Sequence, residues 1–210
     1  MQVVNNNDVK LMKQLLSQSR RVDREGFQPV PRKRETVDVN WAFGEMRETA
    51  LHIACDKGYV EIARLLLADA NIDVNVADVD GNRPIHDTAY NDKRACLALL
   101  LADTRVDVNA VNQEGLRALD MAILRGQSPI IKDLLLSGRQ LNIDRDRLMK
   151  MINNVDYPNW HRMALDTARS VFDFLKDPTA TRARLAAMPD NGRDFTRADM
   201  QDVLDGYDTW

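Results

Sequence analysis

Apolar residues recur at three- and four-residue spacing along the chain, in short runs separated by polar stretches. Residues 62–67 and 96–101 are rich in leucine, and each predicts a packed helix. Residues 8–16 show the same spacing after the first-turn carboxylate Asp8, so we expect a helix there too. Further helices are predicted over residues 145–154 and 160–176.

Two motifs repeat in phase with these helices. One precedes a helix of small residues and begins every 34 residues, at Thr49–His52, Arg83–His86 and Arg117–Asp120. The other marks the same period to within one residue, at Val37–Asn40, Ile72–Asn75 and Val106–Asn109. A fixed period of this length is the sequence signature of a stacked repeat protein.

The two motifs resemble the ankyrin family, whose unit reads T-P-L-H-x-A-A, then a glycine, a helix ending in leucines, and D-V-N with a turn. The usual period is about 33 residues, and here residues 69–72 lengthen one loop. The resemblance implies an all-α ankyrin-repeat solenoid of helix-turn-helix units with short β-turn tips. Because each unit exposes an apolar face, helical caps are expected at both ends.

This pattern predicts four segments. Residues 1–40 hold the N-terminal cap helix and a long basic loop, which contains the cluster Arg32-Lys33-Arg34. Residues 41–140 hold three repeats, and residues 141–176 hold C-terminal capping helices. Residues 177–210 are interrupted by Pro178 and Pro189 and are expected to form a loosely helical tail.

Composition adds little that is specific. Apolar residues make up 44% and charged residues 29%, with a formal net charge of −3, so no basic footprint for nucleic acid stands out. The first residues lack the pattern of a secretion signal, and no apolar run approaches the roughly 20 residues of a membrane span. Cys55 and Cys96 are expected to be reduced core thiols, which favours a cytoplasmic location, in the cell of origin or in a host cell.

Candidate chemistry is sparse. His52 and Cys55 share a helix face, yet in ankyrin-like units this histidine links neighbouring repeats and the later position belongs to the core. His86 repeats the role of His52, whereas Asp120 departs from it, so we expect an atypical junction with the C-terminal cap. The acidic runs at residues 78–81 and 190–194 fail the ligand spacing of a calcium loop. We therefore expect no catalytic residues, no metal and no cofactor.

The resemblance implies that turn tips and first helices form one continuous concave face that binds another protein. Some residues on this face are not required for packing of the core, and these are predicted to contact the partner: Trp41, Phe43, Met46, Asp56, Lys57, Val79, Asp80, Tyr90, Asn91, Leu116, Leu124 and Arg125. The alternative is that the long N-terminal loop covers the apolar members of this set. We expect a monomer.

Three hypotheses about function remain open from the sequence, the third being a purely structural cap-and-spacer role within a larger assembly. The first is a protein-recognition module, either an adaptor or the target-recognition domain of an effector, since the style of the sequence also resembles bacterial ankyrin proteins delivered into host cells. The second is a set of repeats that delivers substrate to a small enzymatic or regulatory C-terminal segment. Asn75 and Asn109 each lie eight residues after a leucine, which resembles the pattern of asparagine hydroxylation in ankyrin repeats. The alternative is that these asparagines have a purely structural role in the turns.

Overall fold

The computed structural model describes residues 8–19, 38–148 and 165–187. The basic cluster, the end of the helix predicted over residues 145–154, the start of the helix predicted over residues 160–176, and the end of the tail lie outside these ranges. In chain order the helices are α2 (Val9–Ser19), α3 (Ala50–Lys57), α4 (Val60–Leu67), α5 (Pro84–Tyr90), α6 (Arg94–Ala102), α7 (Ala118–Leu124), α8 (Ser128–Leu136), α10 (Leu165–Lys176) and α11 (Pro178–Ala187).

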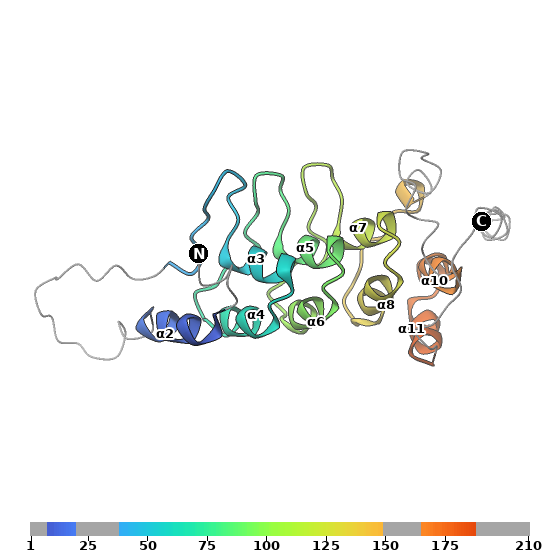
Figure 1. Cartoon of the computed structure of the whole chain (residues 1–210). Coiled ribbons are helices and arrows are strands. Elements are labelled where there is room, and N and C mark those ends of the chain that lie inside the picture. Colours follow the sequence, from blue (N-terminus) through green and yellow to red (C-terminus); the bar gives the residue numbers. More distant parts are fainter. Residues whose placement is uncertain (1–7, 20–37, 149–164, 188–210) are drawn as a thin grey trace, which may run out of the picture.

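The repeats stack in two layers, with their loops projecting from one side (Figure 1). Helices α3, α5 and α7 contact one another in sequence and form the inner layer beneath the loops. Helices α2, α4, α6 and α8 form the outer layer and also contact one another in sequence. The predicted all-α solenoid is confirmed, and within the described residues the only β pairing outside helices is an isolated bridge between Phe43 and Glu48 in the first loop.

The same hydrogen bond forms at the start of each inner helix. The residue at the third helical position accepts a hydrogen bond from the backbone N–H of the residue before the helix, which has no partner inside the helix. The acceptor is His52 Nδ1 for the Thr49 N–H, at 3.1 Å, and His86 Nδ1 for the Arg83 N–H, at 3.0 Å. In the third repeat Asp120 Oδ2 accepts from the Arg117 N–H at 2.9 Å, so this aspartate makes the same hydrogen bond within its repeat as the two histidines do.

The histidines also link neighbouring repeats through their second ring nitrogen. Because Nδ1 accepts, Nε2 carries the proton and donates: His52 Nε2 lies 3.1 Å from Asn82 O, and His86 Nε2 lies 3.1 Å from both Ala110 O and Leu116 O. Asp120 cannot donate in this way and instead lies 3.6 Å from Arg147 Nε, in an ion pair. The predicted atypical junction after the third repeat is confirmed.

A second set of links runs through the turns after the outer helices. Asn75 donates through Nδ2 to Arg105 O at 2.8 Å and accepts at Oδ1 from the Asp107 N–H, also at 2.8 Å. Asn40 and Asn109 make the equivalent pairs of bonds with the turns that follow them, again at 2.8 Å. The asparagine side chains thus form a ladder along the stack and have a structural role in the turns.

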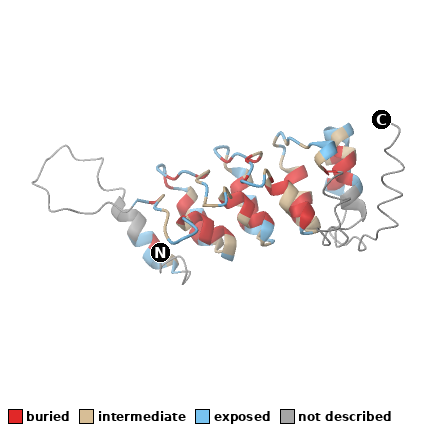
Figure 2. Cartoon of the chain, turned by 90° about the horizontal axis from the view of Figure 1, so that it is seen from above, coloured by how far each residue is buried: buried red, intermediate tan, exposed pale blue. Residues whose placement is uncertain are grey.

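Burial is concentrated in the helices of the repeats, which carry most of the red in Figure 2. Leu51, Ile62, Leu97 and Leu100 are fully enclosed, and Met12 of α2 closes the N-terminal end of this core at 5% exposure.

The C-terminal end is closed by α10 and α11, both of which contact α8. Val171 and Phe172 of α10 are buried, as the pattern predicts. Residues 178–187, expected to belong to a loose tail, form a regular helix whose Thr181 and Leu185 are 3% and 1% exposed. Arg182 fastens this helix by donating to Leu135 O at 2.9 Å and to Arg139 O at 2.8 Å. The first part of the predicted tail is therefore packed against the last repeat.

Asp92 occupies a backbone position that suits glycine. It has φ +55°, and the residues 34 positions before and after it, Gly58 and Gly126, have φ +75° and +67°. A side chain is disfavoured in this left-handed region because Cβ crowds the following carbonyl oxygen. We expect Asp92→Gly to raise the free energy of unfolding by about 0.5–1 kcal/mol in urea denaturation. Asp92→Ala keeps the Cβ, so a gain of the same size in that variant would contradict the explanation.

Candidate binding surface

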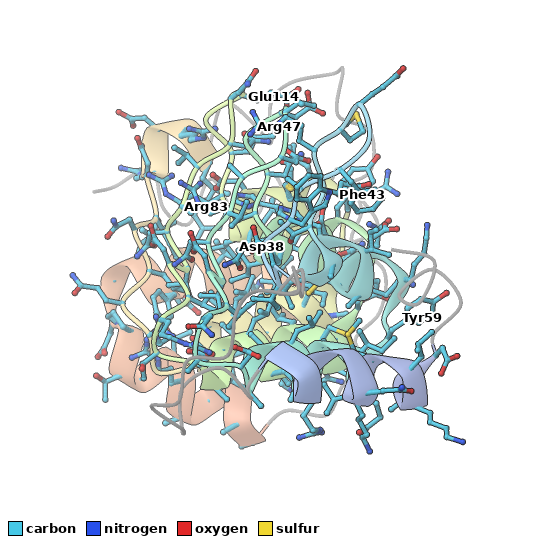
Figure 3. All side chains as sticks on the ribbon, turned by 90° about the vertical axis from the view of Figure 1, so that its left-hand side faces the viewer. Asp38, Phe43, Arg47, Tyr59, Arg83 and Glu114 are labelled. Atoms are coloured by element: carbon cyan, nitrogen blue, oxygen red, sulfur yellow. The ribbon has the colours of Figure 1, made fainter. Side chains whose placement is uncertain are left out.

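Three predicted contact residues lie open to solvent. Trp41 is 65% exposed, Met46 44% and Tyr90 46%, which is unusual for large apolar side chains in a protein with ample core. Trp41 and Met46 belong to the first loop and Tyr90 to the end of α5. Figure 3 shows Arg47 and Glu114 at the ends of the first and third loops, and Phe43 above α3.

The charged and polar members of the predicted set lie between α3 and α5 or at the rim. Asp56 accepts from Asn91 Nδ2 at 2.7 Å and pairs with Lys57 Nζ at 2.7 Å, which ties the ends of the two inner helices together. Lys57, Asp80 and Arg125 are exposed, whereas Phe43 and Val79 are partly exposed. The Arg125 guanidinium lies over the Tyr90 ring, with its carbon 4.4 Å from the ring centroid.

Two residues that were predicted to be exposed and to contact the partner are in fact buried. Leu116 and Leu124 are each 8% exposed and belong to the hydrophobic core. Leu116 is held at the base of its loop, because its N–H donates to Asn112 Oδ1 at 2.8 Å and its carbonyl accepts from His86. Leu124 occupies the position of Tyr90 in the next repeat, 34 residues later. Burying an aliphatic side chain such as leucine is favourable, so Leu124 turns into the core, whereas the tyrosine stays at the surface.

The loop tips are tied to one another, which fixes the shape of the concave face. The Val79 N–H donates to Met46 O at 3.0 Å, and the Gln113 N–H donates to Asp80 O at 2.9 Å. Gln113 Nε2 also donates to Val79 O at 2.6 Å. These bonds run from each loop to the next and hold the tips at a constant separation.

Between the second and third loops the concave face contains a half-open hollow of about 430 Å³. Its walls come from the loop before α5, from α5 itself, and from the loop before α7, with Met121 of α7 also in the lining. The lining includes three carboxylates, Asp80, Asp87 and Glu114, and the phenol ring of Tyr90. None of the described side chains that line this hollow is a lysine or an arginine.

Asp87 lines this hollow but was not among the contact residues predicted from the sequence. Its Oδ2 atom has under 1 Å² of exposed surface and no hydrogen-bond partner within the described ranges. A signal was available, because the residues 34 positions before and after it are the apolar Ile53 and Met121. A carboxylate at a position that is apolar in the other repeats is a local conflict of the kind found at functional sites.

Two carboxyl groups in this part of the concave face, Asp87 and Glu48, have raised pKa values. The pKa of Asp87 lies well above its ordinary value, first because of burial and then because Asp78, Asp56 and Glu48 are close by. The pKa of Glu48 is also raised, by burial and then by Asp56 and Asp78. Acidic charge from the first and second repeats is therefore concentrated around Asp87.

The raised pKa predicts a pH-dependent stability. The folded chain holds the Asp87 proton more tightly than the unfolded chain does, so this residue costs stability as pH rises from about 4 through its folded pKa. We expect Asp87→Asn, which cannot ionise, to raise the free energy of unfolding by about 1 kcal/mol at pH 7. The gain should vanish near pH 4, as measured by urea denaturation at both pH values. A loss at pH 7 would show that the carboxylate is stabilising.

No nucleophile is built from His52 and Cys55. Cys55 is fully buried, and burial raises its pKa well above the ordinary value, which is the reverse of what thiolate chemistry requires. Within the described residues no group of three or more His, Cys, Asp or Glu side chains could hold a metal ion. Nor does that part of the chain contain a helix long and apolar enough to cross a bilayer.

Comparison with known families agrees with this architecture. A model of the ankyrin repeat matches residues 46–79, and a model of multiple ankyrin repeats matches residues 89–135. The two matches together cover α3, α4, α6, α7 and nearly all of α8, and they leave out most of α5 and part of the loop before it.

Curated relatives match over short stretches. Protein phosphatase 1 regulatory subunit 12A of Mus musculus is 48% identical over 52 residues, which is 24% of this chain and 5% of that protein. E3 ubiquitin-protein ligase mind-bomb of Drosophila melanogaster is 39% identical over 59 residues, covering 28% of this chain and 5% of that protein. BCL-6 corepressor-like protein 1 of Homo sapiens is 46% identical over 44 residues, covering 21% and 2%. The chain thus matches only a small part of each relative's length.

Proposed function

Because this chain is an ankyrin-repeat protein, and so belongs to a class of protein–protein interaction modules, we propose that it binds a partner protein on its concave face. The observation that carries the proposal is the exposure of Trp41, Met46 and Tyr90 on that face. Aromatic side chains surrounded by charged groups are the composition of interface hot spots. The tied loop tips add to this, since a rigid surface loses little entropy when it binds.

The proposed role is binding rather than catalysis, as an adaptor or as the target-recognition domain of an effector. Relatives that carry similar repeats include a regulatory subunit of a phosphatase and a ubiquitin ligase, each of them a much longer protein than the matched segment. We further propose that the chain works as a monomer in the cytosol. The buried, unpaired thiols of Cys55 and Cys96 support that location, because they suit a reducing compartment.

The test is an affinity pull-down with the wild type, a Trp41→Ala/Tyr90→Ala double variant and a Leu11→Ala control, with bound proteins quantified by mass spectrometry. Leu11 is a fitting control because it is 39% exposed but lies on α2 in the outer layer. We expect the double variant to lose at least one partner by about tenfold or more, because truncating hot-spot aromatics costs about 2 kcal/mol each.

The control should recover that partner at the wild-type level. The partner is then purified and its affinity for the three forms measured directly. Equal recovery of every captured protein by the wild type and the double variant would contradict binding on the concave face.

A further inference from the structure

The hollow beside α5 gathers negative charge on the concave face. Asp80 and Glu114 contribute exposed carboxylates from two successive loops, and Asp87 contributes one from the helix between them. Glu48, Asp56 and Asp78 lie close enough to raise the pKa of Asp87. Such a concentration of charge on a surface already suited to protein binding favours a cationic group of the partner.

Asp87 shows that this recess is incomplete by itself. A buried carboxylate oxygen without a hydrogen-bond partner is costly, and Asp87 Oδ2 is in that position. Its neighbours in the stack show that an apolar residue fits there, since Ile53 is 5% exposed in the equivalent position of the first repeat. The carboxylate is therefore not dictated by packing.

Three cationic side chains of the described residues near the hollow have other partners. Lys57 pairs with Asp56, Arg83 Nη1 donates to Val111 O at 3.0 Å, and the Arg125 guanidinium lies on the ring of Tyr90. None of these three side chains lines the hollow. The recess is large enough for one long side chain, at about 430 Å³.

We propose that this hollow receives a lysine or arginine side chain from an extended segment of the partner, with the Asp87 carboxylate as its acceptor and Asp80 and Glu114 at the rim. The proposal rests on the proposed function, since it names the chemistry that the concave face recognises. A charged donor in the hollow would pair with the Asp87 carboxylate that lines it, in a hydrogen bond of the strong, charge-assisted kind. A metal ion is disfavoured, because the described side chains hold no group with the arrangement of a metal site.

The test selects a phage-displayed library of random 12-residue peptides on the full chain. We expect the enriched peptides to share one lysine or arginine, and replacing that residue by norleucine to weaken binding by about tenfold or more. Asp87→Asn should weaken the parent peptide by a similar factor and the norleucine peptide hardly at all, because both changes remove the same contact. Glu61→Gln, which removes an exposed carboxylate from α4, should leave both affinities unchanged.

The outcomes separate this inference from the function on which it rests. Enriched peptides without a basic residue that still lose binding to the Trp41→Ala/Tyr90→Ala variant would overturn the inference and leave the concave face as the binding site. A shared basic residue whose contribution survives Asp87→Asn would also overturn it. No enrichment, or peptides indifferent to both concave-face variants, would overturn the inference and the proposed function together.

Discussion

Replacing His86 by alanine is expected to lower the free energy of unfolding by about 4 kcal/mol at pH 7.5, in line with the loss of a buried ring and its hydrogen bonds. The imidazole is fully buried and serves three backbone groups: the Arg83 N–H and the carbonyl oxygens of Ala110 and Leu116. Alanine leaves all three without this partner and opens a cavity between the second and third repeats. Urea denaturation followed by circular dichroism measures the loss.

His52→Ala is the matched comparison, since its ring is equally buried and makes the same kinds of bond, with the Thr49 N–H at Nδ1 and the Asn82 carbonyl oxygen at Nε2. We expect a loss of similar size, and a negligible one would contradict the importance of the histidine links between repeats. Burial lowers the pKa of His86, so its contribution to stability is complete above the unfolded value of about 6.5 and is lost as pH falls through the folded pKa. The penalty for His86→Ala should therefore shrink at pH 5.

Gly81→Ala is the second large effect, with an expected loss of about 3 kcal/mol, made up of left-handed backbone strain and overpacking. Gly81 has φ +77°, and a Cβ there would lie 2.9 Å from the backbone nitrogen of Gln113 in the next loop. That nitrogen donates to Asp80 O, so the clash also breaks the link that positions Asp80 beside the hollow. Binding of any partner on the concave face should weaken as well.

Gly44→Ala separates the two causes. Gly44 has φ +69° in the first loop, but a Cβ there would meet nothing within 4 Å. We expect it to lose only about 1 kcal/mol, the cost of backbone strain. If both substitutions prove equally costly in thermal and urea denaturation, close approach of the loops plays no part.

The period of the two motifs was enough to predict the fold. Inner helices follow Thr49, Arg83 and Arg117 as expected, because a histidine or aspartate three residues later satisfies the same backbone N–H in each repeat. The period does not extend to the caps, so residues 178–187 were expected to be only loosely helical, and their packing against the last repeat was not predicted. That helix is held through Arg182 by carbonyl oxygens of the last repeat, a contact that no local pattern reveals.

The candidate site was predicted less well, because the sequence reading treated equivalent positions as equally exposed. Tyr90 is exposed and Leu124 is buried although they share a position in the repeat. Asp87 was overlooked although its departure from Ile53 and Met121 is visible in the sequence. Its lack of a hydrogen-bond partner, however, depends on which side chains three separate elements bring to one place, and this required the structure.

The repeated asparagine bonds imply that this stack could accept an additional unit between its existing repeats. Asn40, Asn75 and Asn109 make the same two bonds to the following turn, so an additional 34-residue unit would find ready partners at any junction along that edge. The histidine links are less permissive, since they end at Asp120. Gene duplication could therefore lengthen the protein ahead of its third repeat without redesigning a contact, whereas the C-terminal junction fixes where the array must stop.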